Sequence, residues 1–162
     1  MEEIDAIDRR ILDLLQVDAS LSLAEIAEQV HLSTNACWNR IRRLETAGVI
    51  RQRVALLDAA KLGVGQTIFV LVRAAEHSEE WFQNFSTIIK SMPAVVEFHR
   101  TSGEIDYIFK VQVPDAASYD EIYKTLIRSA RCAGVSGVFS MEVLKQTTAL
   151  PLPEPVRGSE SR

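Results

Sequence analysis

The feature that most constrains this chain is a helical pattern of apolar residues, broken once, that runs from Leu21 to Ile50. In its first part the apolar residues recur every three or four positions and therefore share one helix face: Leu23, Ile26, Ala27 and Val30. Ser22 precedes this helix and Glu25 follows three residues later, which is the pattern of a capping box. The break at residues 31–32 is short, so it predicts a tight turn between two helices.

The second helix is predicted to begin after a cap at Ser33 or Thr34 and to end at Gly48. Its inward stripe consists of Cys37, Ile41 and Leu44. Its outward side carries amide, aromatic and guanidinium groups: Asn35, Trp38, Asn39, Arg42 and Arg43. The two helices therefore predict a helix-turn-helix whose second helix is buried on one side only.

An outward side of this kind suits the major groove of DNA, because Arg bonds guanine bidentately and Asn bonds adenine in the same way. The alternative is a solvated face in an ordinary helical domain, since helix pairs without DNA also occur. Charge favours DNA: residues 1–30 carry two Arg against eight Asp or Glu, a balance of −6, whereas residues 31–53 carry five Arg against Glu45, a balance of +4. The predicted DNA contacts are Ser33, Thr34, Asn35, Trp38, Asn39, Arg40, Arg42, Arg43, Arg51 and Arg53.

Segments on both sides of the motif complete a predicted winged helix-turn-helix domain at residues 1–57. Residues 4–16 have apolar positions at helical spacing and predict a helix behind the motif, with its exposed acidic face turned away from DNA. Residues 49–57 are rich in strand-forming types and predict a wing, from which Arg51 and Arg53 reach the sugar-phosphate backbone. Residues 58–65 are short and glycine-bearing, and they are the predicted linker.

The second half of the chain predicts strands and helices in the order βαββαβ, a ferredoxin-like sandwich with both helices on one face of an antiparallel sheet. The expected last strand covers residues 135–144. The fold class is therefore α+β, with a second domain at residues 66–150 and a flexible tail at residues 151–162. A partner sheet is also predicted, because the uncovered face is expected to hold too many apolar side chains to stay in water: Phe69, Leu71, Phe98, Phe109 and Val111.

A turn between two of these strands is the second place where binding chemistry is concentrated. Gly103 allows backbone amides to approach a ligand closely, and Asp106 offers a carboxylate for an ammonium group. The alternative is a plain hairpin turn in which Asp is only a turn former. The residues by themselves leave these two interpretations equally open.

The segment DAIDRRILDLLQVDASLSLAEIAEQVHLSTNACWNRIRRLETAGVI resembles the N-terminal winged helix of the Lrp/AsnC, or feast/famine, regulators. The resemblance continues through VALLDAAKLG into the second half and covers nearly the whole chain. It implies a DNA-binding transcriptional regulator that binds an operator and pairs into dimers, commonly into octamers. Residues 78–82 and the pair Cys37–Trp38 resemble a branch that includes cysteine-responsive regulators.

The resemblance also implies an effector site between subunits. Gly103, Asp106 and Tyr107 match the family's G-x-x-D-Y loop position by position, and the loop also includes Glu104 and Ile105. Hydroxyl side chains of the last strand join this pocket in the family, which here implies Val138, where the hydroxyl is lost, and Ser140. Ser136 lies on the same face of that strand. The implied effector is a small or apolar free amino acid, such as cysteine, because an apolar wall disfavours a charged side chain.

Other functions are weighed against this interpretation. An enzyme would have to use His99, Asp106 and Tyr107, and an oligomerisation scaffold would need no DNA at all. We expect no cofactor and no metal, because His99 has no second ligand at a suitable spacing and two cysteines are too few for a metal site. Cys132 is a weak candidate for redox chemistry. Without an apolar run of about 20 residues or a secretory signal, we expect no membrane contact and a cytoplasmic protein.

Overall fold

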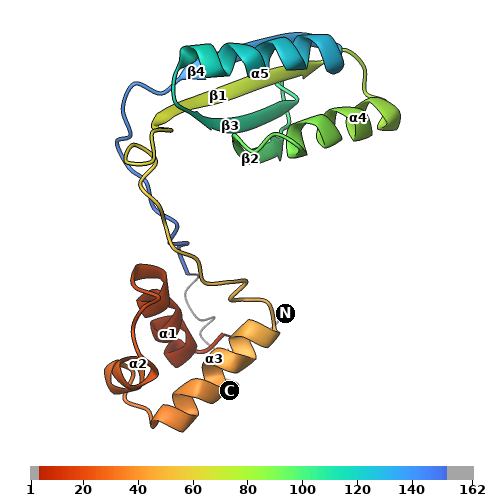
Figure 1. Ribbon diagram of the computed structural model, residues 1–162. Coiled ribbons are helices and arrows are strands. Elements are labelled where there is room, and N and C mark those ends of the chain that lie inside the picture. The colour runs from red at the N-terminus through yellow and green to blue at the C-terminus, as the bar shows by residue number, and fades with distance from the viewer. Residues whose placement is uncertain (1–3, 153–162) are drawn as a thin grey trace. The chain divides into compact units, whose positions relative to one another are not determined.

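The computed structural model describes residues 4–152, which form two compact units. The first, here called the helical unit, runs to Ala55 and also takes in the described residues from Lys145 onward. The second, here called the sheet unit, runs from Leu56 to Leu144. Figure 1 labels the helices and strands of both.

The helical unit contains α1 (Ala6–Val17), α2 (Leu23–Gln29) and α3 (Thr34–Thr46), as the apolar spacing predicted. Each helix begins at a side-chain cap, and the caps of α2 and α3 are the predicted Ser22 and Ser33. Gly48, with φ of +72°, follows α3 as the predicted terminating glycine. The three helices enclose a core of Ile11, Ile26, Ala27, Val30, Cys37 and Ile41.

The predicted wing strand is wrong. In the described chain, residues 49–57 have no strand structure, and Val54 and Leu57 are 59% and 74% exposed. A strand needs a neighbour with which to exchange backbone hydrogen bonds, and this segment has no such neighbour among residues 4–152.

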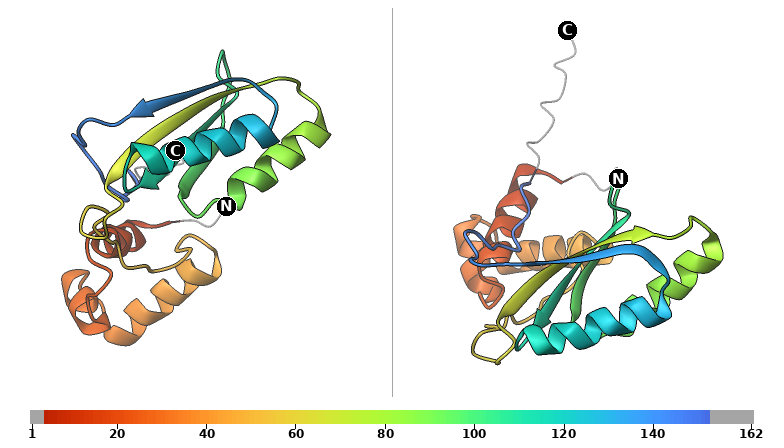
Figure 2. Two further views of the ribbon diagram at one scale, coloured as in Figure 1. Left: turned by 45° about the horizontal axis from the view of Figure 1, so that its top comes forward. Right: turned by 90° about the horizontal axis from the view of Figure 1, so that it is seen from above.

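The sheet unit has the predicted βαββαβ order, with every strand pair antiparallel and a spatial strand order of β2-β3-β1-β4. Its elements are β1 (Gln66–Ala74), α4 (Glu79–Lys90), β2 (Val95–Arg100), β3 (Tyr107–Val113), α5 (Ala116–Ser129) and β4 (Cys132–Phe139). Helices α4 and α5 cover the same face of the sheet (Figure 2). The last strand begins and ends earlier than the predicted residues 135–144.

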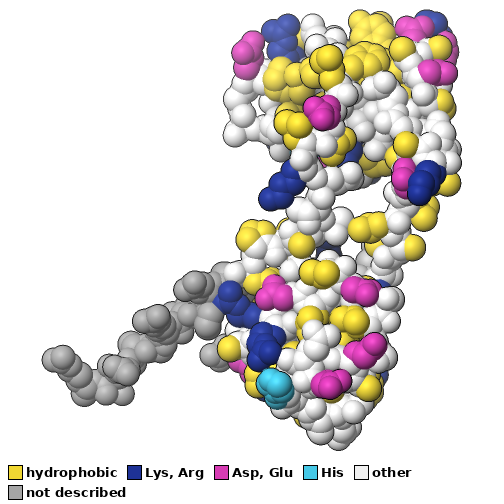
Figure 3. All heavy atoms as spheres, turned by 90° about the vertical axis from the view of Figure 1, so that its left-hand side faces the viewer, with side chains coloured by type: hydrophobic (Ala, Val, Ile, Leu, Met, Phe, Trp, Pro, Cys, Tyr) yellow, Lys and Arg dark blue, Asp and Glu magenta, His cyan; other side chains and the backbone are white. Residues whose placement is uncertain are grey.

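The helix-covered face holds the core of the sheet unit, and it takes residues that were expected on the other face. Phe109 and Val111 are fully buried under the helices, and the ring of Phe98 lies 5.7 Å from that of Phe85 in α4. The expected uncovered patch is therefore smaller than predicted. Figure 3 shows hydrophobic side chains interspersed with charged ones on one side of each unit.

The uncovered face, here called the open face, still carries apolar side chains. Phe69 is 40% exposed there and pairs across the strands with Val138, which is 47% exposed. Leu71 is half-buried beside Ser136. An apolar strip of this kind is what a partner surface would cover.

Residues 145–152 belong with the helical unit, whereas the predicted second domain extended to residue 150. The Gln16 side chain exchanges two hydrogen bonds with the backbone of Leu150, at 3.2 and 2.6 Å. The Arg9 guanidinium donates to the Leu152 carbonyl at 3.0 Å. These polar contacts to α1 explain the boundary, and residues 153–162 of the predicted flexible tail lie outside the described residues.

Candidate DNA-binding and effector sites

The outer side of α3 presents most of the predicted DNA contacts to solvent. Every predicted contact is exposed except Arg40, which is half-buried. The Ser33 hydroxyl accepts a hydrogen bond from the Ala36 backbone N–H at 3.2 Å, so its first role is to cap the helix. A shallow hollow of about 360 Å³ runs along this side, lined by Asn39, Arg42, Arg43, Thr46 and Ala47.

Arg42 and Trp38, one helical turn apart, form a pair on this surface. The Arg42 guanidinium carbon lies 5.3 Å from the centre of the Trp38 ring, and the Trp38 side chain is 45% exposed. The stacking is a cation–π contact, which holds the guanidinium in place while leaving its N–H groups available. Among residues 4–152, Arg42 forms no ion pair.

Arg40 and Arg43 behave differently, because both bind the carboxylate of Asp8 in α1. The Arg40 guanidinium lies 2.8 Å from Asp8 Oδ1 and 2.6 Å from Asp5 Oδ2, and Arg43 bonds the other oxygen of Asp8. The Asp8 side chain is completely buried, so the predicted acidic face of α1 is partly an internal anchor for α3. In the sequence, the feature that could have indicated this anchor is the pair of carboxylates three residues apart at the start of the helix, Asp5 and Asp8.

The charges in this network stabilise one another. Burial by itself raises the pKa of Asp5, but hydrogen bonds from the Asp8 backbone N–H and from Arg40 outweigh it and hold the pKa below its ordinary value of 3.8. Hydrogen bonds to Asp5 and Asp8 in turn raise the pKa of Arg40. Arg40 therefore serves mainly to fasten α3 to α1.

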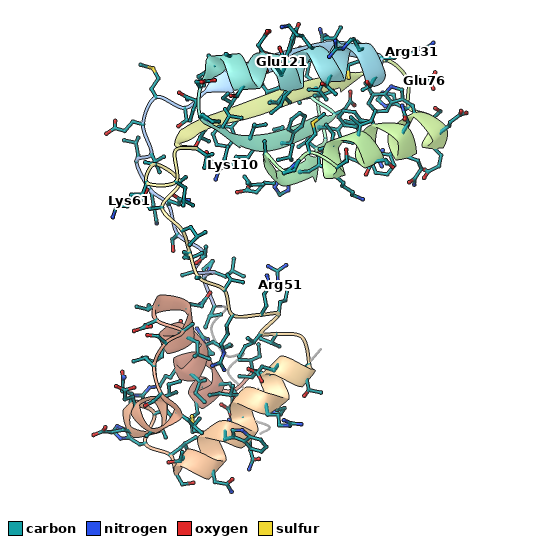
Figure 4. All side chains as sticks on the ribbon, in the orientation of Figure 1. Arg51, Lys61, Glu76, Lys110, Glu121 and Arg131 are labelled. Atoms are coloured by element: carbon teal, nitrogen blue, oxygen red, sulfur yellow. The ribbon has the colours of Figure 1, made fainter. Side chains whose placement is uncertain are left out.

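The two arginines that follow α3 are also distinct from each other. Arg53 donates to Glu45 at 3.0 Å, and the side chains of both are about half exposed, so the pair stabilises little. Arg51 is exposed on the segment leaving α3 (Figure 4). Both guanidinium groups remain within reach of solvent.

The predicted effector loop is a tight turn between β2 and β3. Gly103 has a φ of +113°, a conformation that strongly favours glycine. The Thr101 N–H donates to the Asp106 carbonyl at 2.8 Å, and the Thr101 hydroxyl bonds the Ile105 carbonyl. These bonds close the loop, with Glu104 exposed at its tip.

Asp106 and Tyr107 point to opposite faces of the sheet. Asp106 lies on the open face, where its carboxylate accepts from the Ala74 N–H at 2.8 Å and lies 3.9 Å from His77 Nε2. The Tyr107 ring is only 4% exposed and packs 5.0 Å from Phe85 in the core. A ligand beside Asp106 therefore meets the backbone of Tyr107 but not its phenol group.

The residues expected from the last strand are spread along the open face. Ser136 pairs with Leu71, Val138 pairs with Phe69, and the Ser140 N–H donates to Thr67 at 2.9 Å. Along β1, Thr67 lies six residues from Arg73, the residue beside Asp106. Six residues correspond to about 20 Å at roughly 3.4 Å per residue. Within one chain, a single amino acid near Asp106 can reach the Ser136 row but not Ser140.

The residues proposed for an enzyme are not brought together. His99 lies on the open face 3.6 Å from Glu97, whereas the Tyr107 ring is buried on the other face. Within residues 4–152 no group of three His, Cys, Asp or Glu side chains could hold a metal ion. Burial raises the pKa of the Cys132 thiol to about 11, so it stays protonated at neutral pH. No helix in the described residues is long and apolar enough to cross a membrane.

Comparison with known proteins gives consistent similarities for both units. The family model of the AsnC-type helix-turn-helix domain matches residues 4–45, and that of the Lrp/AsnC ligand-binding domain matches residues 67–150. A glutamate uptake regulatory protein of Zymomonas mobilis is 51% identical, covering 95% of this chain and 94% of that protein. The DNA-binding transcriptional activator DecR of Escherichia coli is 47% identical, covering 92% and 99%.

Solved structures agree in fold. An AsnC family transcriptional regulator from Agrobacterium tumefaciens superposes with a TM-score of 0.87 at 49% identity, covering 91% of this chain and 96% of that one. A transcriptional regulator from Neisseria meningitidis, solved as a complex with L-Met, has a TM-score of 0.86 at 28% identity, with the same coverage.

Proposed function

Because the chain belongs to the Lrp/AsnC family of DNA-binding transcriptional regulators, we propose that it controls genes of amino-acid metabolism or transport through a double-stranded DNA operator. Its relatives are regulators, so the chain is a regulator and not an enzyme. The observation that carries the proposal is the exposed outer side of α3, fastened from behind to the buried Asp8. Binding to an operator places its action in the cytoplasm, with the DNA.

We assign different roles to the arginines of α3. Arg42, stacked on Trp38 and without an ion pair in residues 4–152, reads a base edge in the major groove together with Asn35 and Asn39. Arg40 and Arg43 hold the helix to α1. Ser33, Thr34, Arg51 and Arg53 contact phosphates.

The second part of the proposal is a response to a free amino acid at the Gly103–Tyr107 loop. Asp106 takes the ammonium group, and backbone N–H groups near Gly103 face the carboxylate. Ile105 and Val138 are apolar, so we expect a small or apolar effector, with cysteine as one candidate. The relative bound to L-Met supports this class of ligand.

We further infer a dimer through the open face, with the octamer as a larger assembly. Phe69, Leu71 and Val138 form the apolar strip that a partner would cover. A dimer presents two copies of α3, so the operator should be an imperfect palindrome with half-sites about one helical turn, or a multiple of it, apart. Effector binding between subunits would then shift assembly and, by linkage, DNA affinity.

Selection of binding sites from random duplex DNA tests the DNA part of the proposal, followed by titration of the enriched site with and without each of the twenty amino acids. We expect an enriched palindrome whose affinity changes with at least one amino acid. The Asp106→Ala variant should keep basal DNA binding and lose that response. No enrichment at all would leave the scaffold interpretation, and sedimentation as a monomer at micromolar concentration would contradict the dimer.

A further inference from the structure

Arg73 lies beside the effector loop on the open face, and it belongs to none of the motifs predicted from the sequence. Strand β1 pairs Val72 with Tyr107, and just beyond that pair the Asp106 N–H donates to the Val72 carbonyl at 3.0 Å, so Asp106 lies beside the end of β1 that carries Arg73. On the other side of β1, Arg73 pairs with Gly134 of β4. The side chains of Val72 and Tyr107 are buried under the helices, and because side chains alternate along a strand, Arg73 and Asp106 belong to the open face.

The Arg73 side chain packs against Gly134 of β4. A Cβ atom at Gly134 would lie 3.1 Å from Arg73 Nη2 and 3.2 Å from Nε, so the guanidinium lies directly against the backbone of β4. The absence of a side chain at Gly134 therefore lets Arg73 lie across the sheet instead of projecting into solvent.

The guanidinium of Arg73 has no partner within the described residues. Arg40 and Arg53 each bind a carboxylate of their own unit, but residues 4–152 supply neither an ion pair nor a hydrogen bond to the Arg73 guanidinium. Asp106 is the acid beside this end of β1, yet its carboxylate bonds the Ala74 N–H and lies toward His77. One cationic and one anionic group therefore lie at the same end of the open face without binding each other.

We propose that Arg73 joins the backbone N–H groups near Gly103 in binding the α-carboxylate of the effector, while Asp106 binds its ammonium group. This inference rests on the proposed amino-acid response. The Asp106 carboxylate bonds the Ala74 N–H while the Arg73 guanidinium lies against Gly134, so the two charged groups are separate and one zwitterion can bind both. Guanidinium groups bind carboxylates through two parallel N–H···O bonds, which fixes orientation as well as charge.

The proposal defines the ligand class more narrowly than the loop alone does. A ligand must carry a free ammonium and a free carboxylate on the same carbon, so amines, amino-acid amides and internal peptide residues are excluded. The ligand side chain then extends along β1 toward Leu71 and Ser136. That row offers one apolar group and one hydroxyl, which agrees with a small or apolar side chain.

The test compares four amino acids with their carboxamides: cysteine, alanine, methionine and leucine. Binding to the full-length protein is measured by calorimetry for wild type, Arg73→Gln and Arg100→Gln. Arg100 is the matched control, because it is exposed and near the loop but pairs with Tyr107 and so belongs to the other face. We expect wild type and Arg100→Gln to bind at least one acid about 10- to 100-fold more tightly than its amide, the value of a hydrogen bond to a charged group. Arg73→Gln should bind both forms about equally.

The outcomes separate the role of Arg73 from the amino-acid response as a whole. Acid-over-amide preference that survives in Arg73→Gln overturns this inference and leaves the amino-acid response standing. Failure of wild type to bind any of the twenty amino acids overturns the response and this inference together. A change in the assembly state of ligand-free Arg73→Gln, seen by sedimentation, would make Arg73 a subunit contact and also overturn it. Gly134→Ala keeps the guanidinium but pushes it from its seat, so it should weaken acid binding by less than Arg73→Gln does.

Discussion

Replacing Asp8 by Ala should loosen the recognition helix without touching any group that faces DNA. The Asp8 side chain is fully buried, and its carboxylate accepts from Arg40 at 2.8 Å, from Arg43 and from the Asp5 backbone N–H at 3.2 Å. The substitution therefore removes one half of a capping box and leaves two guanidinium groups without their shared partner. Both losses act on the contact between α1 and α3.

The magnitude follows from burial. Removing one partner of a buried ion pair costs roughly 3–5 kcal/mol, because the remaining charge is left without compensation. Here the Arg40 and Arg43 side chains are 28% and 42% exposed, so water replaces part of the loss. We therefore expect the low end of that range, about 3 kcal/mol, for the free energy of opening of the helical unit.

Hydrogen exchange of individual amides is the suitable assay, because the two units need not unfold together and a single melting temperature would mix them. Amides of α1 and α3 should lose protection in Asp8→Ala, while amides of β1 and β3 keep theirs. Asp13→Asn is the matched control, since Asp13 is an exposed acid on the same helix and should change protection by less than about 0.5 kcal/mol. A loss below about 1 kcal/mol in Asp8→Ala, or an equal loss in the control, would refute the anchoring role.

Three further experiments test different parts of the structure. Arg42→Ala should cost roughly 1–3 kcal/mol of operator affinity and relax the choice at one base pair, whereas Arg43→Ala should mainly lower the hydrogen-exchange protection of α3 amides. Gel shifts on base-substituted operators measure the first effect and hydrogen exchange the second. Equal loss of base choice in both variants would contradict the assigned roles. The pKa of Asp5 in the folded protein is lower than its ordinary value of 3.8, so the unfolded state binds more protons at acid pH. The stabilisation from Asp5 is therefore fully present above pH 3.8 and disappears as the pH falls through the pKa of the folded state. Acid titration of α1 protection should therefore be flatter in Asp5→Asn, and identical curves would remove this linkage. In the sheet unit, a Cβ at Gly137 would lie 2.2 Å from Tyr119 Oη, so Gly137→Ala should destabilise the unit by about 1–3 kcal/mol. Tyr119→Phe should be neutral or stabilising, because that buried hydroxyl has no hydrogen-bond partner in the described residues. Urea unfolding followed by the fluorescence of Trp81 measures both variants, and a destabilised Tyr119→Phe would show that the hydroxyl does form a hydrogen bond.

Local features of this protein were readable from the sequence, because they depend on residues close together in the chain. Apolar spacing and the capping residues Ser22 and Ser33 predicted where helices start, since a cap bonds N–H groups two or three positions away. The order of strands and helices followed from their periods in the same way. Gly103 predicted a turn because few other residues adopt its backbone conformation.

Tertiary structure decided everything that depends on which distant groups meet. Alternation along a strand assigns residues to two faces but does not say which face the helices cover, so Phe109 and Val111 were expected on the wrong side. The two carboxylates at the start of α1 are visible in the sequence, but nothing local shows that Asp8 binds Arg43, thirty-five residues along the chain. The opposite directions of Asp106 and Tyr107, and the seat of Arg73 on Gly134, arise only when three strands pair in register. Long-range pairing is set by the packing of the whole core, and for that reason the binding chemistry of this protein becomes visible only in its folded form.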